Sequence, residues 1–438
     1  MDPLKKDNII AEITPAGRAG VSAIRVSGPD SKHIVSNFFS TELSKERHMY
    51  YVRSTIDDVM LVYYRSPESY TGEDCCEIFC HGNPSVVDHI IKSMIQTHPL
   101  LRMATNGEFT KRAYLNGRID LLQAEAVLDI INSSNVSMAK QKGRILKGEL
   151  STRLLSIKQP LIELSSICEA DIDFSDEGLN VFDPIKVKSS LDGIEQDINS
   201  ILSSASLVKD VSDTIRVLIV GRPNVGKSSL FNKLIEYERA IVHHTPGTTR
   251  DYIEEDIIVD GVEVTFIDTA GVREEVTCDI EKEGIKKVSD IKNTATMIIE
   301  VSDDDVFVEK APLVIKVRNK IDIYDVKRKE KDVHYISTLL GEGIRELKKE
   351  VFDLISQKNK IDTQKTNIFS INTRQINYLN EIKMSIHSLQ NGLSEKVSAD
   401  IFSFMLRDSI SVINKMLGEE DVGEKVLDEL FSRFCIGK

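Results

Sequence analysis

The alternation of apolar and polar positions divides the chain into regions with different predicted structures. Up to about residue 118, short β-like runs such as "IIAEITPAGRAGVSAIRVSG" and "VMLVYYRS" predict an α+β region. In "NGRIDLLQAEAVLDII" (116–131) the pattern changes, and apolar residues recur at helical spacing. Asp120 and Gln123 stand there in the order of a capping box. The helical pattern continues to about residue 210 and predicts a second, helical region.

The middle of the chain has the pattern of an α/β domain, over roughly 213–358. Apolar runs rich in β-branched residues predict strands in "IRVLIVG", "VEVTFID", "LVIKV" and "VHYIS". "IIVDGVEV" predicts a hairpin that turns at Asp260-Gly261. After a polar hinge (356–367), helical patterning runs to the end of the sequence.

These regions suggest a helical domain that is discontinuous in sequence, with the α/β domain inserted into it, so that helices from both flanks share one core. The domains expected are 1–118 (α+β), 119–212 (helical), 213–358 (α/β) and 359–438 (helical).

Composition narrows the class of protein. The formal charge of -13 argues against a general nucleic-acid coat, because phosphate binding needs a local excess of Lys and Arg. Any RNA contact therefore needs a patch or a partner. The sequence has no apolar run near the roughly 20 residues of a membrane span, and no secretory signal. We expect a cytoplasmic protein without a membrane segment.

The cysteines of "CCEIFCH" (75–81) raise the question of a metal site. They lack the paired CxxC spacing of zinc ligands. As a strand, this stretch places Cys76, Ile78 and Cys80 on one face, and Cys75, Glu77 and Phe79 on the other. We expect the cysteines to be buried as small hydrophobic residues.

"GRPNVGKSSL" (221–230) is the clearest chemical motif, because it has the G-x-x-x-x-G-K-S pattern of a P-loop between a predicted strand and a predicted helix. Backbone N–H groups of such a loop bind phosphate oxygens. Lys227 would reach the β- and γ-phosphates, and Ser228 would bind Mg²⁺. The alternative is a chance glycine-rich turn. The expected nucleotide contacts here are Asn224, Val225, Gly226, Lys227, Ser228 and Ser229.

Three later segments indicate that the nucleotide is GTP. "DTAG" supplies an acid for the Mg²⁺ shell and a glycine N–H for the γ-phosphate, and "NKID" ends in a carboxylate. Asp322 can accept from guanine N1–H and the exocyclic amine, a donor pair that adenine lacks. The order P-loop, DTAG, NKxD, Ser is the signature of G proteins. The residues concerned are Asp268, Thr269, Ala270 and Gly271, then Asn319, Lys320 and Asp322, then Ser337 and Thr338.

The group that promotes hydrolysis is less obvious, since Val272 stands where Ras-type enzymes have the water-orienting glutamine. Glu281, in the first turn of a predicted helix, is a candidate for positioning water; an ordinary solvated glutamate is the alternative. Thr249 is a candidate second Mg²⁺ ligand. Asn224 could ligate a monovalent cation at the phosphates, or could be only a turn former beside Pro223.

The chain resembles the MnmE (also called TrmE) family of tRNA modification GTPases from end to end. The resemblance rests on "ITPAGRAGVSAIRVSG", "SYTGEDCCEIFCHGNP", "GEFTKRAYLNGRIDLLQAEAV", "GRPNVGKSSL", "TPGTTRD" and the final "FCIGK", which follow one another in the family's order.

The resemblance implies a potassium-stimulated GTPase that dimerises through its G domains. With a flavoprotein partner, MnmG (also called GidA), which uses FAD and NADH, such proteins modify carbon 5 of the wobble uridine (position 34) in certain tRNAs. It further implies a homodimer, joined to the flavoprotein in a heterotetramer-type complex. The N-terminal domain would hold the dimer together and bind 5-formyltetrahydrofolate or methylene-tetrahydrofolate as the one-carbon source.

The resemblance also implies roles for residues at matching positions. The folate contacts would be Arg25, Glu77, Arg118 and Lys438. Arg118 stands where some members have lysine, which pairs with a carboxylate in a different geometry.

In the nucleotide domain, Glu281 matches the family's catalytic glutamate and Asn224 its potassium ligand. His243 and Thr338 depart from the residues usual at their positions. The loop that would close over the ion and the nucleotide contributes His243, Thr245, Gly247, Thr248 and Thr249, and Arg250, Asp251 and Arg273 match positions that resemble coupling residues.

Cys435, in the final "FCIGK", would lie near the one-carbon chemistry, with Arg433 and Lys438 favouring its thiolate. A packing residue beside Phe434 is one alternative. A prenylation box is another, which Gly437 and the final lysine do not suit.

Two rival functions stay open. One is a regulatory GTPase acting in ribosome or ribonucleoprotein assembly. The other is an N-terminal region that serves only for dimerisation.

Overall fold

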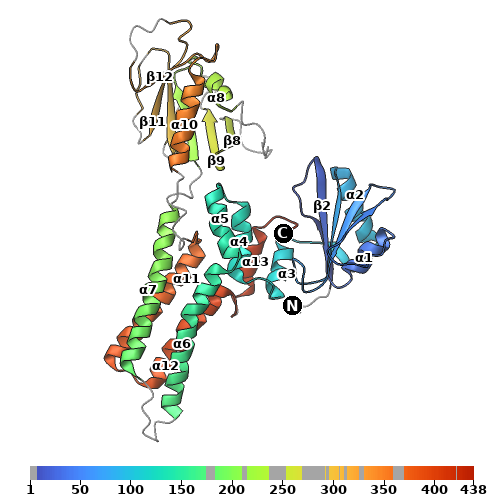
Figure 1. Cartoon of the computed structure of the whole chain (residues 1–438), viewed down its shortest axis with the longest axis vertical. Helices are drawn as coiled ribbons and strands as arrows, with labels where there is room; N and C mark the ends of the chain where they lie inside the picture. Colours follow the sequence, from blue (N-terminus) through green and yellow to red (C-terminus); the bar gives the residue numbers. More distant parts are fainter. Residues whose placement is uncertain are drawn as a thin grey trace, which may run out of the picture. The chain divides into compact units, whose positions relative to one another are not determined.

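The computed structural model (Figure 1) describes residues 7–173, 183–209, 215–235, 253–268, 292, 295–304, 306–309, 313–324, 330–358, 369–420 and 422–438. The chain forms two compact units. Unit 1 comprises Met1–Ile131, Lys142–Leu202 and Ile371–Lys438, and unit 2 comprises Asn132–Gln141 and Ser203–Ser370. Unit 1 therefore contains segments from before and after unit 2 in the sequence. The predicted layout of α+β, helical and α/β parts is confirmed.

The N-terminal part of unit 1 is built on a six-stranded sheet in the order β3-β4-β5-β2-β1-β6. β1 pairs with β6 in parallel, and the other pairs are antiparallel. Helices α1 (Ser31–Phe38) and α2 (Pro84–Thr97) supply buried residues to its main core. The strands are β1 (Asn8–Glu12), β2 (Ala19–Ser27), β3 (Met49–Val52), β4 (Val59–Tyr64), β5 (Cys75–Gly82) and β6 (Leu101–Met103).

Because successive side chains of a strand point to opposite faces, the two faces of this sheet carry different residues. Cys76, Ile78 and Cys80 of β5 belong to the core that α1 and α2 cover, as predicted. Glu77 lies on the other face, directly across from Arg25 of β2. Cys75, Cys76 and Cys80 are all buried, which confirms that they pack as small apolar residues, and burial raises the pKa of Cys75 to about 12.

The helices of unit 1 pack largely through α12 (Ala399–Leu417), which contacts α4, α6 and α11. The capping box predicted at the start of α4 is present: Asp120 N–H donates to Gln123 Oε1 at 2.9 Å, and Gln123 N–H donates to Asp120 Oδ1 at 2.8 Å. The remaining helices are α3 (Glu108–Leu115), α4 (Leu121–Ile131), α6 (Glu149–Asp173), α7 (Pro184–Lys209), α11 (Thr373–Glu395) and α13 (Glu424–Ser432).

The last residues of the sequence return to the N-terminal part of unit 1. After α13 ends at Ser432, the main-chain oxygen of Cys435 accepts from Gly107 N–H at 3.4 Å. The main-chain oxygen of Lys438 accepts from Phe109 N–H at 3.2 Å. These contacts place the tail beside α3.

Unit 2 contains a six-stranded sheet in the order β12-β11-β10-β7-β9-β8, parallel except for the β8–β9 hairpin. The predicted turn is present, with φ of 51° at Asp260 and 78° at Gly261. Helices α8 (Lys227–Ile235) and α10 (Ile344–Lys358) pack into its core. Helix α5 (Val136–Leu146) begins in this unit, where Val136 N–H donates to the main-chain oxygen of Gly261 at 3.0 Å. The strands are β7 (Ile215–Gly221), β8 (Ile253–Val259), β9 (Val262–Asp268), β10 (Met297–Ser302), β11 (Val314–Arg318) and β12 (Val333–Tyr335).

Within the described part of the chain, no helix is both long and apolar enough to span a membrane.

Candidate functional sites

The P-loop motif occupies the turn between β7 and α8, as its strand–loop–helix context predicts. Gly226 has φ of +98°, and a Cβ added there would lie 2.2 Å from Asn319 Nδ2. Only glycine fits this position. Any side chain would clash with the buried amide of Asn319, and residues other than glycine rarely adopt this positive φ. Asn224 also has a positive φ, of 63°, which suits the asparagine that stands there.

Lys227 is buried, and its ammonium group lies inside the loop. Its Nζ donates to the main-chain oxygens of Gly221 at 3.0 Å and Arg222 at 2.9 Å. Ser228 and Ser229 follow in the first turn of α8 and are exposed. The loop therefore presents a helix N-terminus, one cation and two hydroxyl groups, which is the donor set that a Mg²⁺-bound phosphate requires.

The predicted base-binding segments meet the P-loop through Asn319, whose side chain is fully buried. Asn319 Nδ2 donates to the main-chain oxygen of Val225 at 2.8 Å, and Asn319 Oδ1 accepts from Thr338 N–H at 3.1 Å. In the same region, Ser337 Oγ donates to Asp322 Oδ1 at 2.5 Å. One asparagine thus ties the phosphate loop to the segment after β12.

Other predicted residues take their places around this site. Lys320 has φ of 64°, and its Nζ lies 3.2 Å from Asp303 Oδ2. Asp268 is fully buried at the end of β9, opposite Ile219 of β7. The predicted residues that lie outside the described residues are His243, Thr245, Gly247, Thr248, Thr249, Arg250, Asp251, Thr269, Ala270, Gly271, Arg273 and Glu281.

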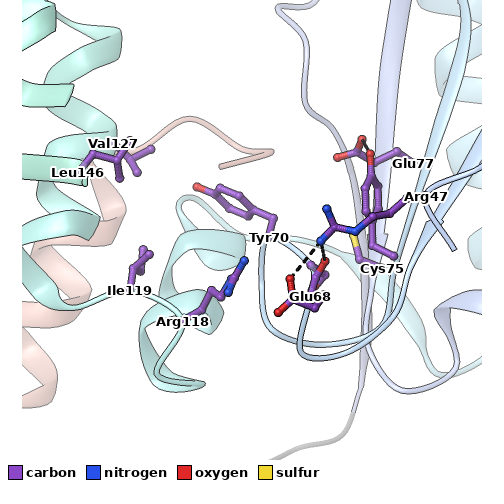
Figure 2. Close-up of a pocket in the computed structure, with 11 residues that line it drawn as sticks. Arg47, Glu68, Tyr70, Cys75, Glu77, Arg118, Ile119, Val127 and Leu146 are labelled. Carbon is purple, nitrogen blue, oxygen red and sulfur yellow. Dashed lines mark hydrogen bonds and ion pairs between the residues drawn. The ribbon is translucent and has the colours of Figure 1, made fainter. Parts of the chain in front are cut away.

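A second candidate site is a pocket of about 360 Å³ in unit 1, shown in Figure 2. Its lining includes two of the predicted folate residues, Glu77 and Arg118. Their spacing in the sequence does not place them side by side, because Glu77 lies in β5 and Arg118 follows α3. The full lining is Arg47, Tyr64, Glu68, Ser69, Tyr70, Cys75, Glu77, Arg118, Ile119, Val127 and Leu146.

Arg25, which is buried, forms an ion pair with Glu77, a partly buried residue of the pocket lining. Arg25 Nε and Nη2 donate to Glu77 Oε1 at 3.1 and 2.9 Å. Glu77 Oε2 accepts from Tyr64 O–H at 3.3 Å. Burial raises the pKa of Tyr64, and the negative charge of Glu77 raises it further, so this hydroxyl remains a donor at neutral pH.

Lys438 belongs to the same neighbourhood. Burial lowers the pKa of its ammonium group, and the positive charge of Arg25 lowers it further, while Glu77 and Cys435 act in the opposite direction. The main-chain oxygen of Lys438 also bonds to Phe109, whose ring lies 5.4 Å from the guanidinium carbon of Arg25, so Arg25, Glu77 and Lys438 share one region of unit 1. Cys435 is an exposed free cysteine in the same tail.

Sequence reasoning missed several residues of this pocket. Tyr70 and Glu68 lie in or beside "SYTGED", a stretch noted only for its resemblance. Figure 2 shows Arg47 paired with Glu68, and an apolar side formed by Ile119, Val127 and Leu146. The lining thus has two arginines, two glutamates and two tyrosine rings beside an apolar wall, with Lys438 close by. Such a set suits a planar polar ligand that also bears a carboxylate.

The parallel sheet, the P-loop after β7 and the NKxD segment after β11 define unit 2 as a P-loop nucleotide-binding domain of the G-protein class. Beyond this class, two family models match most of the chain. The model of the GTP-binding protein TrmE N-terminus matches residues 8–118, and the model of the MnmE helical domain matches residues 121–435.

Relatives extend this match over the whole chain. A protein of Natranaerobius thermophilus named tRNA modification GTPase MnmE is 33% identical over 464 residues, covering 99% of this chain and 100% of the relative. One of Aquifex aeolicus with the same name is 34% identical over 458 residues, with the same coverage. The chain therefore belongs to the MnmE (TrmE) family.

One solved structure, the G domain of the FeoB iron transporter of T. maritima, is 26% identical to this chain and covers 32% of it, with 99% of that domain aligned and a TM-score of 0.24. A TM-score of this size supports no conclusion about function.

Proposed function

We propose that this chain is a potassium-stimulated GTPase that, with a flavoprotein partner of the MnmG type, adds a folate-derived one-carbon group to carbon 5 of the wobble uridine of certain tRNAs. Membership of a family of tRNA modification GTPases supports the broader statement, a GTP hydrolase acting in tRNA modification. The observation that carries the finer statement is the pairing of Arg25 with Glu77 beside Lys438, in a chain that also combines a P-loop with an NKxD segment.

In the nucleotide site, Lys227 Nζ would exchange its hydrogen bonds to the main-chain oxygens of Gly221 and Arg222 for bonds to the β- and γ-phosphates. The phosphates are preferred because they carry a full negative charge. Ser228 and Thr249 would ligate Mg²⁺, and Asp268 would hold its outer shell. Asp322 would accept from guanine, while its hydrogen bond from Ser337 fixes the carboxylate. The bound Mg²⁺ would neutralise charge that develops on the phosphates.

Two residues would replace the glutamine that orients water in Ras-type enzymes and the arginine finger that brings positive charge to the phosphates. Glu281 would position the attacking water. Asn224, already held with a positive φ, would offer its side-chain oxygen to K⁺, together with groups from His243, Thr245 and Thr248. Positive charge beside the β- and γ-phosphates stabilises the transition state.

In unit 1, the pocket would hold 5-formyltetrahydrofolate or methylene-tetrahydrofolate. Arg118 and Lys438 would pair with ligand carboxylates, and Glu77 would accept from ring N–H groups. Burial lowers the pKa of Lys438, and a ligand carboxylate beside it would raise that pKa again by stabilising the ammonium form. The thiol of Cys435 would act near the one-carbon unit.

The same proposal covers the organisation of the molecule. Residues 1–118 would form the folate-binding and dimerisation domain, and 213–358 a G domain inserted into a helical domain of 119–212 and 359–438. The partners would be a second copy of the chain, the flavoprotein with its FAD and NADH, and tRNA. We propose a cytoplasmic location.

The proposal is tested by measuring GTP turnover of the full chain in potassium chloride and in sodium chloride at equal ionic strength. We expect strong stimulation by potassium, loss of that stimulation in Asn224→Ala, and loss of turnover in Glu281→Ala with GTP affinity nearly unchanged. Equal rates in the two salts would separate Asn224 from catalysis and favour a regulatory GTPase. Calorimetry with 5-formyltetrahydrofolate tests the pocket independently, and absence of binding would favour a plain dimerisation module.

A further inference from the structure

We infer that Tyr70 is a positioning residue of the unit 1 pocket, which holds the guanidinium of Arg25 so that its Nη1 faces an acceptor atom of the ligand. This inference rests on the proposed binding of folate to the pocket. It assigns a role to a residue for which neither spacing nor chemistry in the sequence suggested one.

Arg25 makes a set of contacts that leaves a single donor atom unused. Its Nε and Nη2 both donate to Glu77 Oε1. Its Nη1 is buried and has no hydrogen-bond partner among the described residues, while the whole residue is only 7% exposed. A buried guanidinium nitrogen without a hydrogen-bond acceptor is unfavourable. An acceptor atom of a bound ligand would satisfy Nη1 and so favour binding.

Two aromatic rings determine where this atom lies. The guanidinium carbon of Arg25 is 4.5 Å from the centre of the Tyr70 ring and 5.4 Å from that of Phe109. Both distances are within the range of cation–π attraction. Because Glu77 holds one edge of the guanidinium and the rings hold its plane, Nη1 has little freedom to turn away.

Tyr70 is itself held in place from two directions. Its hydroxyl is 2.9 Å from Oγ1 of Thr110, a buried residue of α3. The loop that carries Tyr70 is closed by a hydrogen bond of 2.5 Å from Ser69 Oγ to the main-chain oxygen of Glu73. Figure 2 shows the ring pointing from this loop toward Ile119, Val127 and Leu146 on the opposite side of the pocket.

Tyr70 is better suited to a test than Phe109. Phe109 is fully buried in a small core with Ile9, Ala11 and Ala104, so its replacement would disturb the sheet. Tyr70 is only partly buried: it packs against that core but is not one of its buried residues, so its substitution should disturb the sheet less than that of Phe109.

The experiment is calorimetric titration of the full chain with 5-formyltetrahydrofolate, comparing wild type, Tyr70→Leu, Tyr70→Met and Tyr70→Phe. We expect the two variants without a ring to bind about 5- to 30-fold more weakly, the loss that corresponds to a cation–π contact in a partly desolvated site. Tyr70→Phe keeps the ring, so its affinity should stay within about 3-fold of wild type. Tyr51→Leu, at an exposed tyrosine of β3, is the matched control and should bind normally. GTP turnover and the melting temperature report on folding of each variant.

A double-mutant cycle separates positioning from general support of the fold. If Tyr70 acts through Arg25, Tyr70→Leu should change affinity by less than about 2-fold once Arg25 is methionine. A full additive loss in that background would overturn the inference, as would wild-type affinity in folded Tyr70→Leu or Tyr70→Met. If wild type itself does not bind, the proposed function of the pocket fails and the inference fails with it.

Discussion

At the scale of single residues, the nucleotide site depends on one side chain that sequence motifs treat as a base contact. Asn319 bonds to Val225 in the P-loop and to Thr338 beyond β12, so it also works as a brace between them. A side chain held by several hydrogen bonds in a fully buried place cannot shift without losing them. Its neighbour Gly226 must therefore remain without a side chain.

Gly226→Ala should lower GTP affinity at least about tenfold and destabilise unit 2 by roughly 1–3 kcal/mol, because the new methyl would meet Asn319 Nδ2 and φ is +98°. Gly341→Ala is the matched control: its φ of +79° brings similar backbone strain, but nothing lies within 4 Å of the added Cβ. Equilibrium binding of a labelled GTP analogue measures the difference, which suits a chain without tryptophan. Equal affinities for the two variants would contradict the role of Asn319 as a rigid brace.

At the scale of elements, α3 is attached to the N-terminal sheet by a cluster of charged side chains. Glu108, its first residue, accepts from Arg102 Nη2 at 2.6 Å and from Arg112 Nη2 at 3.0 Å. The N–H of Thr105 also donates to it, at 2.9 Å. Since α3 carries Phe109 and Thr110, this cluster fixes the helix that supports Arg25 and Tyr70.

The same cluster should make the folding stability of unit 1 depend on pH in the acid range. Burial alone would raise the pKa of Glu108, but hydrogen bonds from Arg102, Thr105 and Arg112 outweigh it and lower the pKa from 4.5 to about 2. A folded-state pKa below the unfolded value means that the stabilisation is present above pH 4.5 and is lost as pH falls from 4.5 toward 2.

Glu108→Gln should therefore destabilise unit 1 by about 1–3 kcal/mol at pH 7 and flatten its acid dependence between pH 4.5 and about 2, the range between the unfolded and folded pKa values of Glu108. Scanning calorimetry at several pH values measures both effects. Glu429→Gln is the control, since its ion pair with Arg433 is largely exposed and should contribute under about 1 kcal/mol. An unchanged pH profile in Glu108→Gln would show that other groups determine acid stability.

At the scale of the whole molecule, unit 1 is joined by a buried ion pair between helices that lie 249 residues apart in sequence. Arg374 Nε of α11 donates to Glu125 Oε1 of α4 at 2.5 Å, and Gln375 Nε2 donates to Glu125 Oε2 at 2.6 Å. Glu125 is only 3% exposed. The chain segments before and after unit 2 thus meet at a point where a charge has no access to water.

Arg374→Met should destabilise unit 1 by roughly 3–5 kcal/mol, because it leaves the Glu125 carboxylate buried without its cation. Adding Glu125→Gln should recover much of this loss, since the uncompensated charge is then gone. Arg407→Met removes an exposed ion pair with Glu169 and should cost at most about 1 kcal/mol. Urea unfolding followed by circular dichroism gives the comparison, and equal effects of the two single variants would show that the Glu125 pair is not a structural link.

Local patterns determined much of this protein from sequence alone. The capping box of α4, the Asp260-Gly261 hairpin and the buried faces of β5 follow from residues at most a few positions apart, whose geometry a strand or helix dictates. The P-loop motif likewise predicted its strand–loop–helix setting, since backbone shape there follows from the glycines.

Only the tertiary structure decided which distant residues meet. Arg25 and Glu77 pair because two strands align in register, and Lys438 joins them because the tail binds beside α3. Tyr70 reaches Arg25 from a loop whose position depends on hydrogen bonds to α3. Residue spacing does not encode such contacts, because strand order, register and the packing of the tail come from burial of the whole core rather than from any local pattern.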